Sequence, residues 1–330
     1  MRKVKWGVLS TANIGIQKVL PAMQKGEFTT IEAIGSANRE KAESAAKHLG
    51  IPKVYSSYEE VLSDPEIEAV YIPLPNNLHV DWTIKALEAG KHVLCEKPIS
   101  MDLEEAIVLQ QFAEKYPNLK IAEAFMYKFH PQWIKAKEIV DSGKLGEIKS
   151  IHSHFLYNNV NPDNIRNKKE NGGGGLMDIG CYCISFARLI YNAEPDRVSA
   201  IMELDENFGT DKFASGFLDF GNKSSQFTCS TQMQNSQGIT IFGTEGNLRI
   251  EIPVNIPPET PGKITITTKS GTEEILTEPA DQYTLQGDAF SKVIIENTEP
   301  DYPLADAIAN MRIIDAIKES AEKGSWVNIL

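Results

Sequence analysis

A lysine follows a short apolar run, at a position where a parallel sheet would place it beside a ligand. The run His92–Cys95 leads directly into Glu96, Lys97 and Pro98. An apolar run that stops at charged residues and a proline is typical of a strand that ends there. In an open α/β sheet, ligands bind outside the carboxyl ends of the strands. We therefore expect Lys97 to contact a cofactor and a substrate.

A second segment combines a glycine run with an acidic and an aromatic side chain. It extends from Gly172 to Tyr182 and contains Asp178 four residues before Tyr182. Residues four apart lie on the same side of a helix. The run Gly172–Gly175 fits a flexible linker, but glycines this close to Asp178 favour a close approach of the backbone to a ligand.

These residue types suit the oxidation of an alcohol, in which the hydroxyl proton is removed while a hydride leaves the carbon for a nicotinamide. A tyrosine with the ordinary pKa of about 10 is a poor base at neutral pH. A neighbouring ammonium group favours the phenolate and lowers that pKa. We expect Tyr182 to act as acid/base, Lys97 as its electrostatic partner, and Asp178 as the anchor for the substrate and the lysine.

Each of the three residues also has a structural interpretation, which the sequence leaves open. Lys97 also fits a solvated loop lysine, and Tyr182 fits a half-buried helix tyrosine with its polar tip outward. Asp178 fits the N-cap of a helix that follows a glycine loop, because aspartate is a favoured cap.

The first predicted strand-turn-helix resembles a dinucleotide-binding turn. Such a turn needs small residues so that the backbone can approach a pyrophosphate at the start of a helix. Measured against G-x-G-x-x-G/A, the three positions are Ser10, Ala12 and Gly15, so two glycines are replaced by other small residues. An ordinary tight turn is the alternative. Cofactor contacts are expected here at Ser10, Thr11, Ala12, Asn13 and Ile14.

The end of the second predicted strand favours NADP over NAD. An acidic residue at this position holds the ribose 2′-hydroxyl of NAD. Here the segment Gly35–Arg39 has no carboxylate, whereas Ser36 and Arg39 can bind a 2′-phosphate. The expected contacts are Ser36, Asn38 and Arg39. The alternative is that Arg39 is a solvated residue in the first turn of a helix.

The elements that position these residues alternate between strand and helix over the first 124 residues, which indicates a doubly wound parallel sheet. The predicted strands are 3–9, 31–35, 69–72, 92–95 and 120–124, and the predicted helices are 13–25, 39–49, a short one from 57, 80–89 and 102–116. We therefore expect a Rossmann domain over residues 1–124.

Residues 125–330 are expected to form an α+β domain for substrate binding and oligomerisation. Strand patterns dominate after Gly146, and turn residues at 221–222, 246–247 and 270–271 indicate hairpins. The predicted strands are 148–157, 197–204, 213–220, 224–233, 239–242, 248–252 and 263–268, with helices at 131–141, 178–191, 284–296 and 304–322. A large, mostly antiparallel sheet with helices on one face would leave the other face for a partner subunit.

Composition excludes several other classes of function. The net charge of −12 argues against nucleic acid and anionic membranes as partners, because both bind basic surfaces. No stretch approaches the roughly 20 apolar residues of a membrane span, and no signal peptide is evident. The four cysteines are too few for a disulfide framework, so a cytoplasmic protein is expected. His152 and His154 share a strand face, but no third ligand is evident and no metal is expected.

Four segments resemble the glucose–fructose oxidoreductase/inositol dehydrogenase (Gfo/Idh/MocA) family across essentially the whole chain. They are Pro73–His79, Cys95–Pro98, Glu123–Tyr127 and Gly173–Tyr182. The last is most similar to the branch that holds trans-dihydrodiol dehydrogenase, NADP-dependent xylose dehydrogenase and glucose–fructose oxidoreductase. Many other members carry histidine where this chain has Tyr182, and Ser10 and Ala12 replace the usual glycines.

The resemblance implies further site residues. Cofactor contacts are implied at Leu74, Pro75, Asn76, His79, Glu96, Lys97, Glu123 and Arg166. Tyr127, His130 and Arg166 are expected to line the substrate pocket, with ordinary surface or packing roles as the alternative.

The expected activity is hydride transfer between NADP, or NAD, and a secondary alcohol or carbonyl of a sugar, polyol or cyclic diol. The resemblance also implies a homodimer or higher homo-oligomer through the second domain's sheet. Two alternatives stay open: a non-catalytic nucleotide-binding regulator of the same architecture, and a glycosidase that uses NAD as a transient redox carrier.

Overall fold

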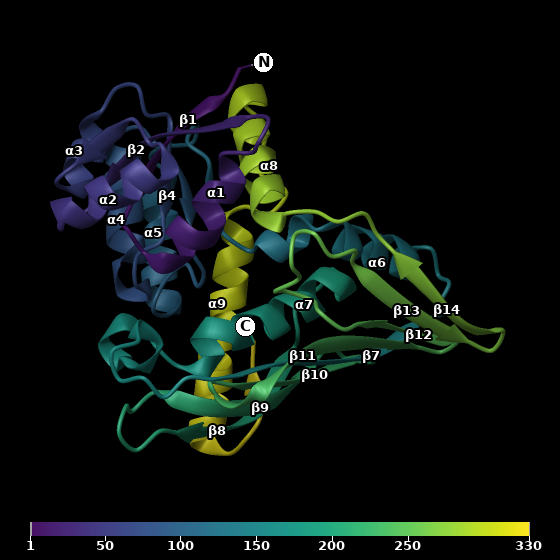
Figure 1. Cartoon of the computed structure of the whole chain (residues 1–330). Helices are drawn as coiled ribbons and strands as arrows, with labels where there is room; N and C mark the ends of the chain where they lie inside the picture. Colours follow the sequence, from purple (N-terminus) through teal and green to yellow (C-terminus); the bar gives the residue numbers. More distant parts are fainter. Residues whose placement is uncertain (1, 330) are drawn as a thin grey trace. The chain divides into compact units, whose positions relative to one another are not determined.

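The computed structural model describes residues 2–329, which form two compact units (Figure 1). The first contains the residues up to Met126 together with Asp281–Ile308, and the second contains Tyr127–Ala280 together with the residues from Ala309 onward. The predicted boundary at residue 124 lies beside the first division. The return of 281–308 to the first unit is a feature that the sequence pattern does not predict.

The first unit is built on a six-stranded parallel sheet with the order β3-β2-β1-β4-β5-β6. Its strands are β1 (Val4–Leu9), β2 (Thr29–Gly35), β3 (Lys53–Tyr55), β4 (Ala69–Ile72), β5 (His92–Cys95) and β6 (Ile121–Glu123). Every residue of β4 is buried, as expected of a central strand covered on both faces. The order reverses between β1 and β4, and ligands bind at such a switch point.

Local signals in the sequence begin and end the helices around this sheet. Asn38 caps α2 by accepting a hydrogen bond from the Lys41 amide, and the helix ends at Gly50 with φ +68°. Ser57 and Asp102 cap α3 and α5 in the same way. The helices are α1 (Leu20–Met23), α2 (Arg39–Leu49), α3 (Tyr58–Ser63), α4 (His79–Glu88) and α5 (Leu103–Ala113).

A late helix, α8 (Gln282–Glu296), completes the core of the first unit (Figure 1). Trp6 of β1 donates its indole N–H to Ser291 over 3.1 Å and packs against Phe290. Asp288 accepts the backbone N–H groups of Glu27 and Phe28, which precede β2. These long-range contacts explain why this helix belongs with residues so distant in the sequence.

The second unit contains a nine-stranded sheet with the order β14-β13-β12-β11-β7-β10-β9-β8-β15. Among the described pairs only β10 with β7 is parallel. The strands are β7 (Ile148–Asn158), β8 (Arg197–Leu204), β9 (Asp211–Asp219), β10 (Ser224–Ser230), β11 (Gln232–Gly243), β12 (Gly246–Ile250), β13 (Lys263–Thr268), β14 (Gly271–Leu276) and β15 (Val327–Asn328). The helices are α6 (Pro131–Asp141), α7 (Cys181–Tyr191) and most of α9 (Leu304–Lys323).

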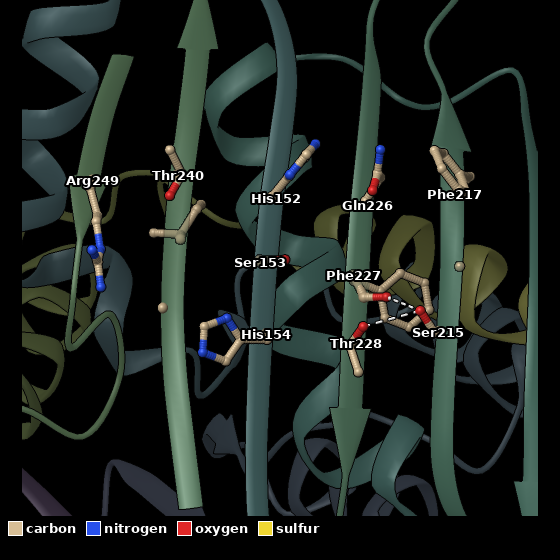
Figure 2. Close-up of a pocket in the computed structure, with 13 residues that line it drawn as sticks. His152, Ser153, His154, Ser215, Phe217, Gln226, Phe227, Thr228, Thr240 and Arg249 are labelled. Carbon is tan, nitrogen blue, oxygen red and sulfur yellow. Dashed lines mark hydrogen bonds between the residues drawn. The ribbon is translucent and has the colours of Figure 1, made fainter. Parts of the chain in front are cut away.

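The two faces of this sheet differ. Helix α7 packs against β7 and β10 on one face. Strand register places Phe217, Gln226, His152, Thr240 and Arg249 in one row on the opposite face (Figure 2). These residues are among those that line a pocket of about 390 Å³.

The predicted fold class is confirmed: a Rossmann sheet is followed by a large, mostly antiparallel sheet with few helices. The expected strand 224–233 is broken after Ser230, where β10 ends and β11 begins. Short strands β3 and β15 and the exposed β14 are not predicted. Two π-helical segments, Gly15–Val19 and Leu176–Gly180, also escape the sequence pattern, which shows only helix.

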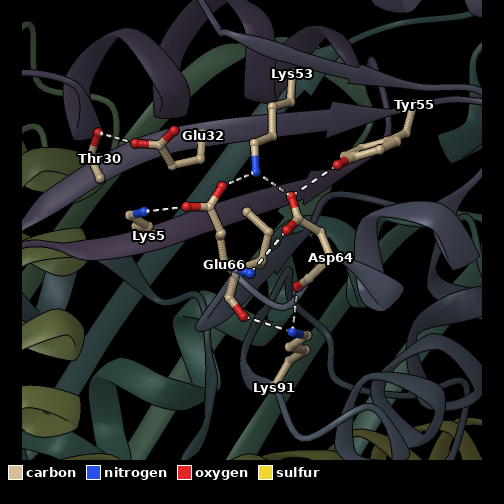
Figure 3. A network of polar contacts seen from close by, with 9 residues as sticks. Lys5, Thr30, Glu32, Lys53, Tyr55, Asp64, Glu66 and Lys91 are labelled. Atoms are coloured by element: carbon tan, nitrogen blue, oxygen red, sulfur yellow. Dashed lines mark hydrogen bonds and ion pairs between the residues drawn. The ribbon is translucent and has the colours of Figure 1, made fainter.

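A polar network joins β3 to the turn before β4 (Figure 3). The buried Asp64 carboxylate accepts hydrogen bonds from Lys53 Nζ at 2.7 Å, the Tyr55 hydroxyl at 2.9 Å and the Glu66 amide at 2.9 Å. Lys91 donates to the carbonyl oxygens of Asp64 and Ile67. The ion pair with Lys53 and the hydrogen bonds from the Glu66 amide and the Tyr55 hydroxyl lower the pKa of Asp64 to about 2, although burial opposes this shift.

This network predicts a specific acid sensitivity. Because the folded-state pKa of Asp64 is depressed, its contribution to stability is complete above pH ~4 and is lost as the pH falls towards 2. Asp64→Asn should cost about 1–2 kcal/mol of unfolding free energy at pH 7 and flatten the decline between pH 4 and 2. Urea unfolding at several pH values measures this, with the exposed Asp81→Asn as control; a constant difference from the wild type across pH 2–6 contradicts it.

Candidate active site

The turn after β1 has an unusual backbone at the first fingerprint position. Ser10 adopts φ +144°, a region that favours glycine, and its hydroxyl accepts a hydrogen bond from the Ala12 amide at 3.0 Å. A π-helical segment then begins at Gly15. Strained residues and π-helical turns cluster at functional sites. Serine therefore takes the place of glycine here with a local hydrogen bond that supports the turn.

The end of β2 presents Ser36 and Arg39 differently. Ser36 is buried, and its hydroxyl accepts a hydrogen bond from the Asn38 amide at 3.2 Å. Arg39 is exposed; its Nε pairs with Glu43 on the same helix at 2.8 Å, and this pair raises its pKa. Its Nη1 also reaches Ser56 at 3.3 Å. Arg39 thus lies in the first turn of α2, as the alternative interpretation expects. A cofactor phosphate would compete with Glu43 for its guanidinium group.

His79 links the segments that follow β4 and β5. Its imidazole is fully buried, with Nε2 2.8 Å from the Leu74 carbonyl and Nδ1 2.7 Å from the Pro98 carbonyl. Burial lowers its pKa, and a neutral imidazole can donate to only one of these oxygens. His79 therefore holds the two segments together, and a direct contact with a cofactor stays a prediction.

Two carboxylates organise the surroundings of Lys97. The buried Tyr71 hydroxyl donates to Glu96 Oε1 at 2.6 Å, and Glu123 Oε1 accepts the Ile99 amide at 2.8 Å. Burial and then the charge of Glu96 raise the pKa of Tyr71. Lys97 itself has intermediate exposure. The loop that carries the lysine is thus fixed on both sides of it.

In the second unit, Asp178 is held by two donors. Its Oδ2 accepts a hydrogen bond from the Tyr157 hydroxyl at 2.7 Å and lies 2.8 Å from Arg166 Nε. The side chain is 12% exposed, and burial followed by the charge of Asp178 raises the pKa of Tyr157. Asp178 lies inside the π-helical segment and not at its N-cap, which is Gly175. Arg166, expected beside a cofactor or substrate, contacts the acid expected to anchor the substrate.

Tyr182 lies in an aromatic cluster. It is 5% exposed, and its ring centroid is 5.9 Å from those of both Tyr127 and Phe155. Tyr127 is fully buried and shares a 2.7 Å hydrogen bond with the Ser185 hydroxyl. Packing against these aromatic rings holds the Tyr182 ring in place, and the Tyr127 hydroxyl is engaged by Ser185.

His130 has a structural role in the second unit. It is fully buried and caps α6, because its Nδ1 accepts the Gln132 amide at 3.2 Å. Burial lowers its pKa. Its expected contact with substrate stays a prediction.

The glycine run is explained by contacts with protein atoms. A Cβ on Gly173 would lie 2.3 Å from the Arg166 carbonyl oxygen, and one on Gly174 would lie 2.0 Å from Asp211 Oδ1. Gly174 also has φ +117°. These glycines let the backbone pass closely over its neighbours, so the run by itself does not indicate a ligand.

The structure thus groups the predicted residues into two sets. Leu74, His79 and Glu96 belong to the first unit with Lys97, and Asp178, Tyr182 and Arg166 belong to the second. The joint action of Lys97 and Tyr182 stays a prediction. Sequence reasoning missed three supporting residues, Tyr71, Tyr157 and Asp211. Only Tyr157 carried a signal, as a polar aromatic residue at the end of the predicted strand 148–157.

The part of the chain that the structure describes contains neither metal-binding side-chain clusters nor membrane-spanning helices. Within residues 2–329, no group of three or more His, Cys, Asp and Glu side chains is arranged to hold a metal ion. In the same part of the chain, no helix has the length and apolar character needed to cross a membrane.

Comparison with known proteins gives the same pattern along the whole chain. Residues 4–123 match the model of an oxidoreductase family with an NAD-binding Rossmann fold, and residues 133–249 match that of the GFO/IDH/MocA C-terminal domain. The chain is 40% identical to an uncharacterized oxidoreductase of Rhizobium meliloti, over 100% of both chains. It is 36% identical to a D-xylose 1-dehydrogenase (NADP(+)) of Haloferax volcanii, over 98% of this chain and 99% of the relative.

Solved structures agree with the sequence matches. A 3-ketoreductase from Actinomadura kijaniata, in complex with NADP and TDP-benzene, is 27% identical, with a TM-score of 0.91 over 97% of this chain and 98% of that one. The two family models, the full-length relatives and the shared fold all point the same way. This chain belongs to the Gfo/Idh/MocA family of oxidoreductases.

Proposed function

We propose that this protein is an NADP-preferring dehydrogenase or reductase that acts on a secondary alcohol or carbonyl of a sugar, polyol or cyclic diol. The observation that carries the proposal is Asp178, a carboxylate fixed by Tyr157 and Arg166 four residues before Tyr182. Among its relatives are a D-xylose dehydrogenase that uses NADP and a trans-1,2-dihydrobenzene-1,2-diol dehydrogenase of Xenopus laevis.

The residues of the first unit fit a nicotinamide dinucleotide. The strand order 3-2-1-4-5-6 has its switch point between β1 and β4, so the turn from Ser10 and the segment from Leu74 share the carboxyl edge where such cofactors bind. When bound, the nicotinamide supplies the hydride acceptor or donor. The protein's part is to bind the cofactor, orient the substrate and move the hydroxyl proton.

In this proposal, Tyr182 exchanges the proton of the reacting hydroxyl, and Lys97 stabilises the phenolate and the developing oxyanion. Asp178 accepts a hydrogen bond from a substrate hydroxyl. Its Oδ2 is engaged by Tyr157 and Arg166, so the carboxylate is held in one orientation before substrate binds. Such preorganisation of acid–base groups contributes roughly 10²–10⁴-fold to rate. The structurally similar ketoreductase has also been solved with one lysine replaced and with one tyrosine replaced. These are the residue types of Lys97 and Tyr182.

The first test is turnover followed by nicotinamide absorbance at 340 nm, with NADP and then NAD, across aldoses, polyols and cyclic diols. Lys97→Met should reduce the turnover of any active substrate by about 10²–10⁴-fold, because the proton transfer loses its cationic partner. Lys85→Met, which removes a surface ammonium stacked on Trp82, should leave turnover unchanged.

Unchanged turnover in Lys97→Met would contradict the assigned role of that lysine. Absence of turnover across the panel, with cofactor still bound, would favour a regulator. Product formed without net change in absorbance would favour an NAD-dependent glycosidase.

The cofactor preference rests on Ser36 and Arg39 and on the absence of a carboxylate at the end of β2. Arg39→Ala should weaken NADP binding about tenfold, because a charge-assisted contact to the 2′-phosphate is lost, and should leave NAD binding within twofold. Fluorescence titration measures both dissociation constants, with the exposed Lys41→Ala as control. Tighter binding of NAD than NADP by the wild type would overturn the preference.

We also propose a homodimer or larger homo-oligomer through the sheet face opposite α7, and a cytoplasmic location. Ile201, Phe217 and Phe242 are 66%, 45% and 36% exposed on this face, and burial against a second copy would remove their apolar area from water. The location is supported by the four cysteines, which are buried thiols and form no disulfide with one another.

Light scattering tests the assembly. The wild type should have at least twice the 36.6 kDa mass of one chain, and Phe217→Arg should shift it towards the monomer, because a charge would be buried in the interface. Val108→Arg, at an exposed position on α5, serves as control. A wild-type mass of 36.6 kDa at micromolar concentration contradicts the proposal.

A further inference from the structure

A buried carboxylate lies beneath the glycine run that precedes the proposed catalytic residues. Asp211, the first residue of β9, is 8% exposed, and its Oδ2 accepts the Leu176 backbone N–H at 2.7 Å. Its Oδ1 occupies the space next to Gly174 where any other residue would place a Cβ. The loop and the carboxylate are therefore fitted to each other.

The contact is made where the helix needs an acceptor. Leu176 is the first residue of the π-helical segment that continues into α7, and the first amides of a helix have no acceptor within it. A carboxylate is favoured there by the helix dipole and by charge-assisted hydrogen bonding.

The surroundings of Asp211 show how its burial is compensated. Burial raises its pKa to about 7, while hydrogen bonds from the amides of Leu176, Asp211 itself and Gly175 and the charge of Lys318 oppose that rise. The charge of Asp211 in turn contributes to the raised pKa values of Cys229 and Tyr157. A buried carboxylate without hydrogen-bond donors would cost free energy of folding. Here the backbone amides at the start of the helix are the main donors to Asp211.

We propose that Asp211 is a positioning residue: through the Leu176 amide it fixes the start of the helical segment that carries Asp178 and Tyr182. This inference rests on the proposed function of those two residues. The Asp178 amide in turn donates to the Gly174 carbonyl at 3.0 Å, so the loop that Asp211 holds also sets the backbone of Asp178. A misplacement of catalytic groups by about 1 Å can cost on the order of 10²-fold in rate.

The test compares Asp211→Ala with Asp211→Asn, whose amide oxygen can still accept the Leu176 N–H. Asp211→Ala should lower kcat about 10- to 100-fold, whereas the dissociation constant for NADP stays within twofold. Asp211→Asn should restore kcat to within about threefold of the wild type, since the hydrogen bond is kept.

The matched control is Asp205→Ala. Asp205 is similarly buried in the neighbouring β8–β9 connection. It accepts hydrogen bonds from the backbone amides of Asn207 and Phe208 and from the Gln232 side chain, and none of these donors belongs to the helix. It should lower thermal stability without reducing kcat of the folded enzyme. An equal loss of kcat in Asp205→Ala, or an unchanged kcat in folded Asp211→Ala, would overturn the proposal.

Hydrogen exchange separates this proposal from the proposed activity. Peptides that cover residues 176–182 should exchange faster in Asp211→Ala than in the wild type or Asp205→Ala, whether or not a substrate has been found. If Asp211→Ala does not fold, Asp211→Asn decides: normal exchange with kcat near wild type supports the proposal. A folded Asp211→Asn enzyme with less than a tenth of the wild-type kcat contradicts it.

Discussion

The proposed chemistry depends on the hydrogen bond and the ion pair that fix the Asp178 carboxylate. A carboxylate that is only 12% exposed needs donors, and the Tyr157 hydroxyl and Arg166 guanidinium supply them at 2.7 and 2.8 Å. The three residues come from the end of β7, a 3₁₀ turn and the π-helical segment before α7. The Asp178 carboxylate therefore links the sheet, the loop and the helix of the second unit.

The first unit shows the same principle with backbone groups. The sheet order places the segments after β4 and β5 next to each other, and His79 spans their carbonyl oxygens. Glu96 and Glu123 are engaged by Tyr71 and by the Ile99 amide on either side of Lys97. A loop that is fixed by several hydrogen bonds can hold a lysine and a cofactor in a defined geometry, because little further conformational entropy of the loop is lost on binding.

Much of the fold was predictable from the sequence because its signals are local. Caps such as Asn38 and Ser57 begin helices where the pattern predicts, and strand runs such as His92–Cys95 end at charged residues. The supporting contacts were not predictable, because they join distant residues: Asp211 with Leu176, Tyr157 with Asp178, and α8 with β1. The two π-helical segments show the same limit, since sequence periodicity does not distinguish them from α-helix.

The proton transfer assigned to Tyr182 is tested by single-turnover reduction of NADP by the Tyr182→Phe variant. This variant keeps the ring packing against Tyr127 and Phe155 and removes only the hydroxyl. NADP should bind with unchanged affinity, while the hydride-transfer rate with the best sugar or diol substrate should fall about 10²–10⁴-fold. A rate within threefold of the wild type would show that another group carries the proton and would contradict the role assigned to Tyr182.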